Sequence, residues 1–175
     1  MCITRIVATL AALTFAVQTA LTAQSVDPND VGSIDQIISA VYDVISGPAG
    51  QTRDWDRWDG LFAESALLSS VGRRQDGSYG RRVMIPESCR ESSGSALEAN
   101  GFFEVEINRV TESYGMIAHA FSTYESRRSL TDAEPFARGI NSFQLMNDGS
   151  RWWVVSVYWQ GEGPDNPLPT KYIGG

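Results

Sequence analysis

The chain has 175 residues, 42% of them hydrophobic and 20% charged, which is enough for one domain with a buried core. It holds 14 basic and 21 acidic residues, and its formal charge at pH 7 is −7. A net acidic surface disfavours DNA, RNA and anionic lipid, because basic residues must neutralise their phosphates. We therefore expect no nucleic-acid partner, and no membrane contact once the leader described next is removed.

Residues 1–25 have the layout of a secretory signal peptide. Arg5 is followed by the apolar run IVATLAALTFAV and then by small residues, which place a cleavage site after Ala23 or Ser25. The run is too short to favour a membrane span, although a retained anchoring helix is the alternative. We expect an exported protein, periplasmic or secreted. Its formal charge becomes −8, because the leader contains one Arg and no acid.

Two helices are expected after the leader. Ser33 begins the first, because Ser33 and Gln36 have the spacing of a capping box, and Gly47 followed by Pro48 ends it. Its buried stripe recurs at helical spacing: Ile34, Ile37, Ile38, Val41 and Ile45.

The second helix is expected from Asp54 to Phe62, with aromatic residues on one side. Trp55 and Trp58 are either core residues or a platform for a ligand. Asp54 and its neighbour Asp56 are either helix-capping residues or a general base near a pocket.

A first strand is expected at Ala66–Val71, followed by an irregular segment, residues 72–101, with at most a short helix near Pro86. This segment is either a lid or a plain insertion. Its arginines form either a solvated loop or an anion-binding arm. Cys89 is alone in the chain without the leader, so no internal disulfide is expected, and the thiol is interpreted as inert. The arginines are Arg73, Arg74, Arg81, Arg82 and Arg90.

Antiparallel strands are expected at residues 102–111, 114–125, 136–146 and 151–160, and an extended tail with three prolines follows. The last two strands form a hairpin, because Asp148 and Gly149 suit the centre of a tight turn. This turn predicts a register that pairs Phe143 with Val154.

His119, the sole histidine, is the main candidate for acid–base chemistry, and Asp54 and Tyr158 are the others. A register that places His119 opposite Phe143 gives it one face with Asn141, Trp152 and Tyr158. Such a group can orient and protonate a carbonyl or hydroxyl compound. The alternative is a buried histidine that supports the sheet. A register shift of one residue would move His119 to the opposite face, away from the other members of this group. One histidine is not a metal site, and we expect no metal and no cofactor.

Arg138 and Tyr124 form a second group, opposite each other on the other face together with Trp159. Arg138 can hold a ligand carboxylate through two parallel hydrogen bonds. Alternatively, it satisfies a structural acid: Glu104, Glu106 or Glu125.

Four stretches, GFFEVEINRV, AHAFSTYESR, EPFARGINSFQL and RWWVVSVYWQGE, carry a family resemblance. With two helices ahead of them, they resemble a bacterial branch of the nuclear transport factor 2-like superfamily, which includes SnoaL-like and ketosteroid-isomerase-like proteins. The resemblance covers roughly residues 34–172. It implies an α+β fold, in which N-terminal helices and a curved antiparallel sheet form a cone-shaped barrel that encloses a pocket, often dimeric through the sheet.

The resemblance does not imply a reaction, because this fold hosts isomerases, cyclases, dehydratases, epoxide hydrolases and binding proteins alike. None of their catalytic sets can be placed here residue by residue. We expect residues 33–172 to form an exported, homodimeric domain that binds a small apolar molecule. The alternatives are an acid–base enzyme acting on an apolar carbonyl compound, or a dimeric interaction module. The predicted pocket residues are Trp55, Trp58, Tyr124, Arg138, Asn141, Trp152 and Trp159.

Overall fold

The computed structural model describes residues 26–174, and the predicted signal peptide lies outside this range. No helix in residues 26–174 combines the length and apolar character needed to cross a membrane. The elements in chain order are α1 (Pro28–Val31), α2 (Ile34–Ile45), α3 (Trp55–Leu61), β1 (Phe62–Arg73), β2 (Tyr79–Met84), α4 (Pro86–Asn100), β3 (Phe103–Tyr114), β4 (Ile117–Arg127), β5 (Ala137–Asn147), β6 (Trp152–Gly161) and the 3-10 helix η1 (Thr170–Tyr172).

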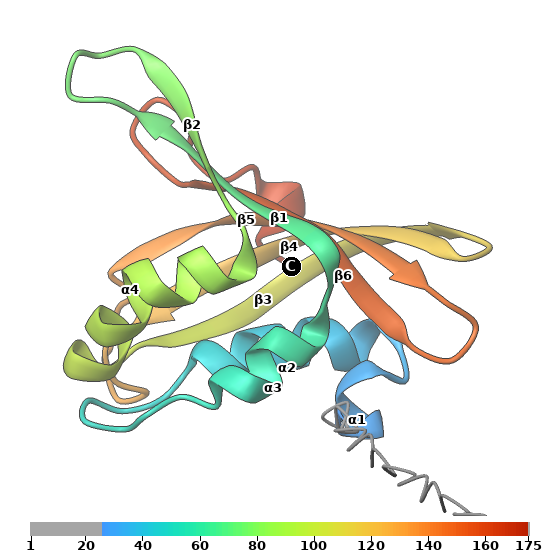
Figure 1. Ribbon diagram of the computed structural model, residues 1–175. Helices are drawn as coiled ribbons and strands as arrows, with labels where there is room; N and C mark the ends of the chain where they lie inside the picture. Colours follow the sequence, from blue (N-terminus) through green and yellow to red (C-terminus); the bar gives the residue numbers. More distant parts are fainter. Residues whose placement is uncertain (1–25, 175) are drawn as a thin grey trace, which may run out of the picture.

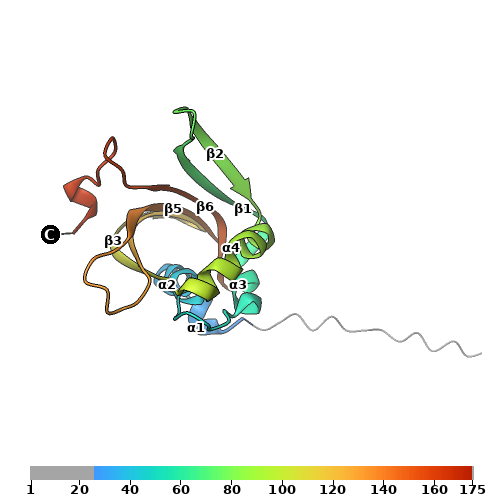
Figure 2. The same ribbon diagram turned by 90° about the vertical axis from the view of Figure 1, so that its left-hand side faces the viewer.

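The strands form one six-stranded sheet in the order β2-β1-β6-β5-β4-β3. The sheet curves around α2, and α3 and α4 lie beside α2 on the same side (Figures 1 and 2). This arrangement confirms the α+β class, the curved sheet and the N-terminal helices. Two details differ from the expectation: β1 pairs with β6 in parallel, and the sheet stays open between its edge strands β2 and β3.

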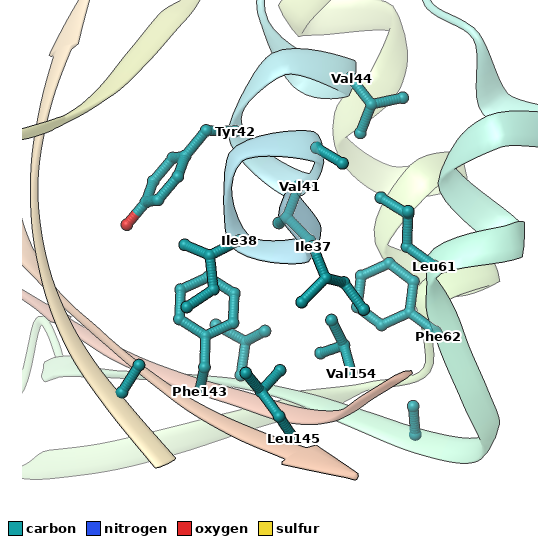
Figure 3. Close-up of a cluster of buried hydrophobic side chains, with 14 of the residues drawn as sticks. Ile37, Ile38, Val41, Tyr42, Val44, Leu61, Phe62, Phe143, Leu145 and Val154 are labelled. Carbon is teal, nitrogen blue, oxygen red and sulfur yellow. The ribbon is translucent and has the colours of Figure 1, made fainter. Parts of the chain in front are cut away.

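The helix α2 fills the concave side of the sheet. Its start is fixed as expected, because the Ser33 hydroxyl accepts a hydrogen bond from the Gln36 N–H at 3.1 Å. Ile37 and Ile38 are fully buried against Phe143 and Val154 of the sheet (Figure 3). Burying one such side chain contributes about 1.5–3 kcal/mol to folding.

The expectation of an irregular segment at residues 72–101 was wrong. The chain forms the hairpin β1–β2 and then the 15-residue helix α4, which starts at Pro86 as expected but continues to Asn100. The sequence of α4 lacks an apolar stripe, so its helical periodicity is weak. Tertiary contacts hold it instead: Gly94 lies against the Trp55 ring, and Glu98 accepts a hydrogen bond from the Trp55 indole at 3.0 Å.

The hairpin β5–β6 forms, but its register differs from the predicted one. Asn147 faces Trp152, so Gly149 and Ser150 are central in the turn. A bulge at Val155 then shifts the pairing again. As a result Phe143 faces Val157, and both Val157 and Trp159 turn to the concave side, which was not expected.

We expect Phe143→Ala to lower the free energy of unfolding by about 3–5 kcal/mol, because it removes a fully buried ring. This ring packs edge-on against the Tyr42 ring, with 6.0 Å between the two ring centroids. Chemical denaturation measures the change. The matched control is Tyr79→Ala on the edge strand β2, where the residue is 60% exposed and the expected change is within about 0.5 kcal/mol. Similar losses in both variants would contradict this packing.

Candidate functional site

A polar network interrupts the apolar concave face where α2 meets β4 and β5. The Tyr42 hydroxyl points away from the aliphatic cluster (Figure 3) and lies 2.6 Å from the Ser122 hydroxyl. It also accepts a hydrogen bond from the Asn141 side-chain amide at 3.1 Å. All three residues are buried, so each needs these partners.

Two glutamates of β3 complete the network. The Asn141 amide donates to Glu104 Oε1 at 3.1 Å, and the Ser126 hydroxyl donates to Glu104 Oε2 at 3.0 Å. Ser122 donates to Glu106 Oε1 at 2.5 Å. The network therefore joins one helix and three strands through side chains alone.

The inward direction of the glutamates follows from the pairing of β3 with β4. Glu104 faces Ser126 and Glu106 faces Tyr124, both on the concave side, whereas Val105 between them is exposed. This reverses the usual rule that the apolar side of an alternating strand is buried. The reversal is stable because α2 presents Tyr42 and Ser46 to this end of β3, and the Ser46 hydroxyl accepts a hydrogen bond from the Glu104 N–H at 3.0 Å.

Tyr124 lies beside the network, across Gly139 of β5. A Cβ at Gly139 would approach the Tyr124 hydroxyl to 2.5 Å, so only glycine leaves room for this ring. Tyr124 is buried, and the nearby Glu104 carboxyl contributes to its electrostatic environment.

Burial dominates the electrostatics of these groups. It raises the pKa of Glu104 from 4.5 to about 7, although the hydrogen bonds from Ser126 and Asn141 oppose the increase. Burial, reinforced by the nearby Glu104 charge, also raises the pKa values of Tyr42 and Tyr124 well above the ordinary range. At neutral pH the two phenols are therefore protonated, while the Glu104 carboxyl is partly protonated and partly ionised.

An open hollow of about 520 Å³ leads to the network from outside. It lies between α2 and the edge strand β3, where Glu104 and Tyr42 form part of its wall beside Phe103 and Leu130. Val105 adds apolar surface to this wall, whereas Asp43, Glu106, Ser39 and Ser46 add polar groups. A ligand in this hollow would meet several polar groups among apolar surface, which is a common composition for small-molecule sites.

Four of the predicted site residues lie on the concave face, and three of them lie in or beside the network. Asn141 belongs to the network, Tyr124 adjoins it, and Trp159 lies directly opposite Asn141 on β6. Trp159 also packs against the buried core, so it contributes apolar surface next to the polar groups. The sequence analysis placed Tyr124 and Trp159 on the other face from Asn141, and this assignment was wrong because the β4–β5 register and the β6 bulge both differ.

The predicted group around His119 does not form. His119 faces Gln144, one residue away from the expected position, and therefore points to the convex side. Its side chain is 49% exposed and lies 3.3 Å from the Glu112 carboxylate. Tyr158 is also exposed on the convex side, opposite Ser142, whereas Trp152 packs against the core on the concave side.

The remaining candidates have structural contacts. Asp54 caps α3 by accepting a hydrogen bond from the Arg57 N–H at 2.9 Å. Trp55 and Trp58 contact each other edge-on and pack between α3 and α4, where the Trp58 indole donates to the Pro86 carbonyl at 3.2 Å.

Arg138 pairs with an acid that the sequence analysis did not consider. It faces Glu125 on the convex side but binds the Glu162 carboxylate at 2.8 Å. Glu162 also accepts a hydrogen bond from the Leu168 N–H, so this pair fastens the C-terminal tail to the sheet. The expectation that Tyr124 faces Arg138 was wrong, since Tyr124 faces Gly139.

Within residues 26–174, no three His, Cys, Asp or Glu side chains are arranged so that they could hold a metal ion. The acidic groups of the network are instead satisfied by hydroxyl, amide and guanidinium donors. Glu106, for example, lies 3.3 Å from Arg109.

Sequence reasoning missed Tyr42, Glu104, Ser122 and Ser126 as site residues. One signal was present for Tyr42, because it follows the buried Ile38 by four positions and therefore lies on the same side of the helix. For β3, the alternation separated glutamates from apolar residues correctly. It could not show which set faces inward.

No protein-family model and no curated protein matches the sequence. Solved structures do match. A protein of unknown function with a cystatin-like fold from Nostoc punctiforme has a TM-score of 0.55 at 14% identity, covering 78% of this chain and 92% of its own. A protein of unknown function from Mycobacterium tuberculosis also has a TM-score of 0.55, at 16% identity over 81% of this chain and 82% of its own.

The β subunit of a putative aromatic-ring-hydroxylating dioxygenase from Novosphingobium aromaticivorans gives a TM-score of 0.55 at 15% identity, over 75% of this chain and 88% of its own. The chain has the nuclear transport factor 2-like fold. This fold, also described as cystatin-like, is the one that the family resemblance implied. At these identities the likeness shows the fold alone.

We expect the stability of the protein to fall as pH rises from about 4.5 to 7, because of Glu104. The unfolded carboxyl ionises near pH 4.5 and the folded one near pH 7, so between these values the folded state retains a proton that the unfolded state has lost. The stabilisation is complete below the lower value and is lost as pH rises through the upper one. The contribution of Glu104 to the free energy of unfolding changes by up to about 3 kcal/mol across this range.

Glu104→Gln should flatten this dependence in denaturation curves collected across the window. Asp148 and Glu162 do not interfere, since their pKa values are lowered and they titrate below it. Equal slopes in the two proteins would show that Glu104 is solvated.

Proposed function

We propose that this chain is a binding protein for a small, mainly apolar molecule, which it holds through one polar group at Glu104. The observation that carries the proposal is the position of this carboxyl: it belongs to a buried hydrogen-bonded network and also forms part of the wall of an open hollow. The Tyr42 ring, Phe103 and Leu130 provide apolar contact around it.

The network favours binding over catalysis. Tyr42, Ser122, Asn141 and Ser126 form their hydrogen bonds within the network, and Asn141 and Ser126 hold the Glu104 carboxyl in place before a ligand arrives. A pre-positioned acceptor lowers the entropic cost of binding a ligand that donates a hydrogen bond to it. Acid–base chemistry on a carbonyl compound is the alternative, with Glu104 as the base in place of His119 or Asp54.

The protein is exported in this proposal, on the strength of the leader-like pattern in residues 1–25. The ligand is accordingly a compound met outside the cytoplasm.

We expect the protein purified from its own host to retain a small molecule in native mass spectrometry, released on denaturation. Titration of the recovered compound should then show binding to Glu104→Gln weakened at least about tenfold, because a charge-assisted hydrogen bond is replaced by a weaker one. Conversion of the compound during the titration would support the enzyme alternative.

Glu112→Gln is the matched control, because Glu112 lies on the same strand but is exposed on the convex side. It should bind like the unaltered protein. Equal weakening in both variants, or no ligand by extraction and titration, would refute the proposal.

A second candidate function, self-association through the convex face of the sheet, has its own support. Apolar side chains are exposed there on four neighbouring strands, around a hollow of about 550 Å³. A continuous exposed apolar patch commonly marks an interaction surface. These residues are Tyr114, Ile117, Met146 and Val155.

We expect Ile117→Asp to convert a homodimer into a monomer in sedimentation velocity, because Ile117 is 61% exposed in the centre of this patch and a charge there must be desolvated on association. Tyr79→Asp, at an exposed position on β2 outside the patch, should leave the dimer intact. An unaltered protein that stays monomeric at high concentration would exclude this function.

A further inference from the structure

The outer parts of β1 and β2 form a projecting hairpin, residues 69–83, which we call the arm. In both views it extends beyond the rest of the molecule (Figures 1 and 2). A tight turn ends it: the Arg74 N–H donates to the Ser78 carbonyl at 2.7 Å, and Gly77 adopts a φ of +84° that suits glycine. Of the five arginines predicted to form either a solvated loop or an anion-binding arm, Arg73, Arg81 and Arg82 lie on these paired strands and Arg74 lies at the turn. Arg90 lies in α4 instead and pairs with Asp59 at 2.9 Å.

The arm carries a local positive charge on an acidic molecule. Arg74, Arg81 and Arg82 form no ion pair with any group in residues 26–174, and Arg73 reaches only the exposed Asp165 at 3.6 Å. The arm contains these four arginines and one acid, Asp76. Without the arm and without Arg5 of the leader, the body of the molecule has 9 basic and 20 acidic residues. The acids of the body do not neutralise the arm, which leaves its guanidinium groups available to a partner.

The arm also has a free hydrogen-bonding edge. β2 is the last strand of the sheet and pairs only with β1, and all six of its residues are exposed or half-exposed. The outward N–H and C=O groups of such a strand can pair with another extended segment. Side chains alternate along β2, so Arg81 and Arg82 point to opposite faces and flank this edge on both sides.

We propose that the arm binds an extended acidic peptide segment of another protein, which adds to β2 as a further strand. The charges select this occupant. A second copy of β2 is repelled, because its arginines would lie beside Arg81 and Arg82. A strand with carboxylates instead gains ion pairs on either face in addition to its backbone hydrogen bonds.

A long polyanion fits the arm less well than a peptide does. It would be drawn by the same arginines but would continue onto the body, where acidic residues outnumber basic ones about two to one. It also lacks peptide groups that could pair with the free edge. This surface is separate from both the hollow at Glu104 and the convex apolar patch, so the proposal does not depend on the function proposed above.

The test uses fluorescence anisotropy with a short fluorescein-labelled peptide in which glutamate alternates with valine. A second peptide of equal charge carries proline in place of valine, which prevents strand pairing. We expect the protein without residues 1–25 to bind the first peptide at least about tenfold more tightly than the second. The double variant R81A/R82A should lose at least about tenfold in affinity for the first peptide.

Arg127→Ala is the matched control, because it removes a positive charge that is already paired with Glu125 at 2.8 Å away from the arm. It should bind like the unaltered protein, and the melting temperature of R81A/R82A should be unchanged. Hydrogen exchange of the outward amides in Tyr79–Met84 should slow when the first peptide binds.

Three results would overturn the proposal. Equal binding of the two peptides would show that charge acts without strand addition. Tight binding of heparin, used as the polyanion probe, with no binding of either peptide would identify a polyanion surface. Failure of all three probes to bind would show that the exposed arginines serve solubility only.

Discussion

Ile37 and Ile38 of α2 pack fully buried against Phe143 and Val154, and this contact between a helix and the concave side of a sheet governs the remaining structure. A sheet that covers a helix on one side must curve, and the bulges in β3 and β6 and the irregular β1–β6 pairing supply the curvature. The bulges also decide which side chains face α2. For the candidate site residues on the sheet, the strand registers and bulges decide which face each residue occupies.

The polar network lies where the apolar stripe of α2 ends. Burying Glu104 costs free energy, as its raised pKa of about 7 shows, and the donors Asn141 and Ser126 offset only part of that cost. A fully apolar set of residues at this end would avoid the cost. A half-buried carboxyl beside an open hollow, with Tyr124 close by, is the pattern of a site that stability alone does not explain.

The molecule presents three separate surfaces: the hollow at Glu104, the apolar patch of the convex face, and the basic arm. The C-terminal tail covers another part of the convex face, because Arg138 and Glu162 fasten it to the sheet and Tyr172 packs on Phe121. The covered part of the sheet is thereby removed from the surface. Ile117 and Met146 lie in the part that stays exposed.

The sequence by itself determined the local elements. Ser33, Gly47 and the isoleucine stripe predicted α2, Asp54 predicted the start of α3, and alternation predicted the later strands, because capping, helical spacing and alternation act over a few residues. The tertiary structure decided the registers. A bulge or a shift of one residue changes no local propensity but turns whole faces around, which moved His119 outward and Trp159 inward.

The same limit applies to the elements that lack a strong local pattern. α4 has little apolar periodicity and is held by Trp55, and the arm is ordered by pairing with β1, so residues 72–101 were predicted as irregular. Glu104 became a site residue only because α2 places Tyr42 and Ser46 next to β3. Long-range packing, which the sequence does not display, thus decided where the buried carboxyl lies.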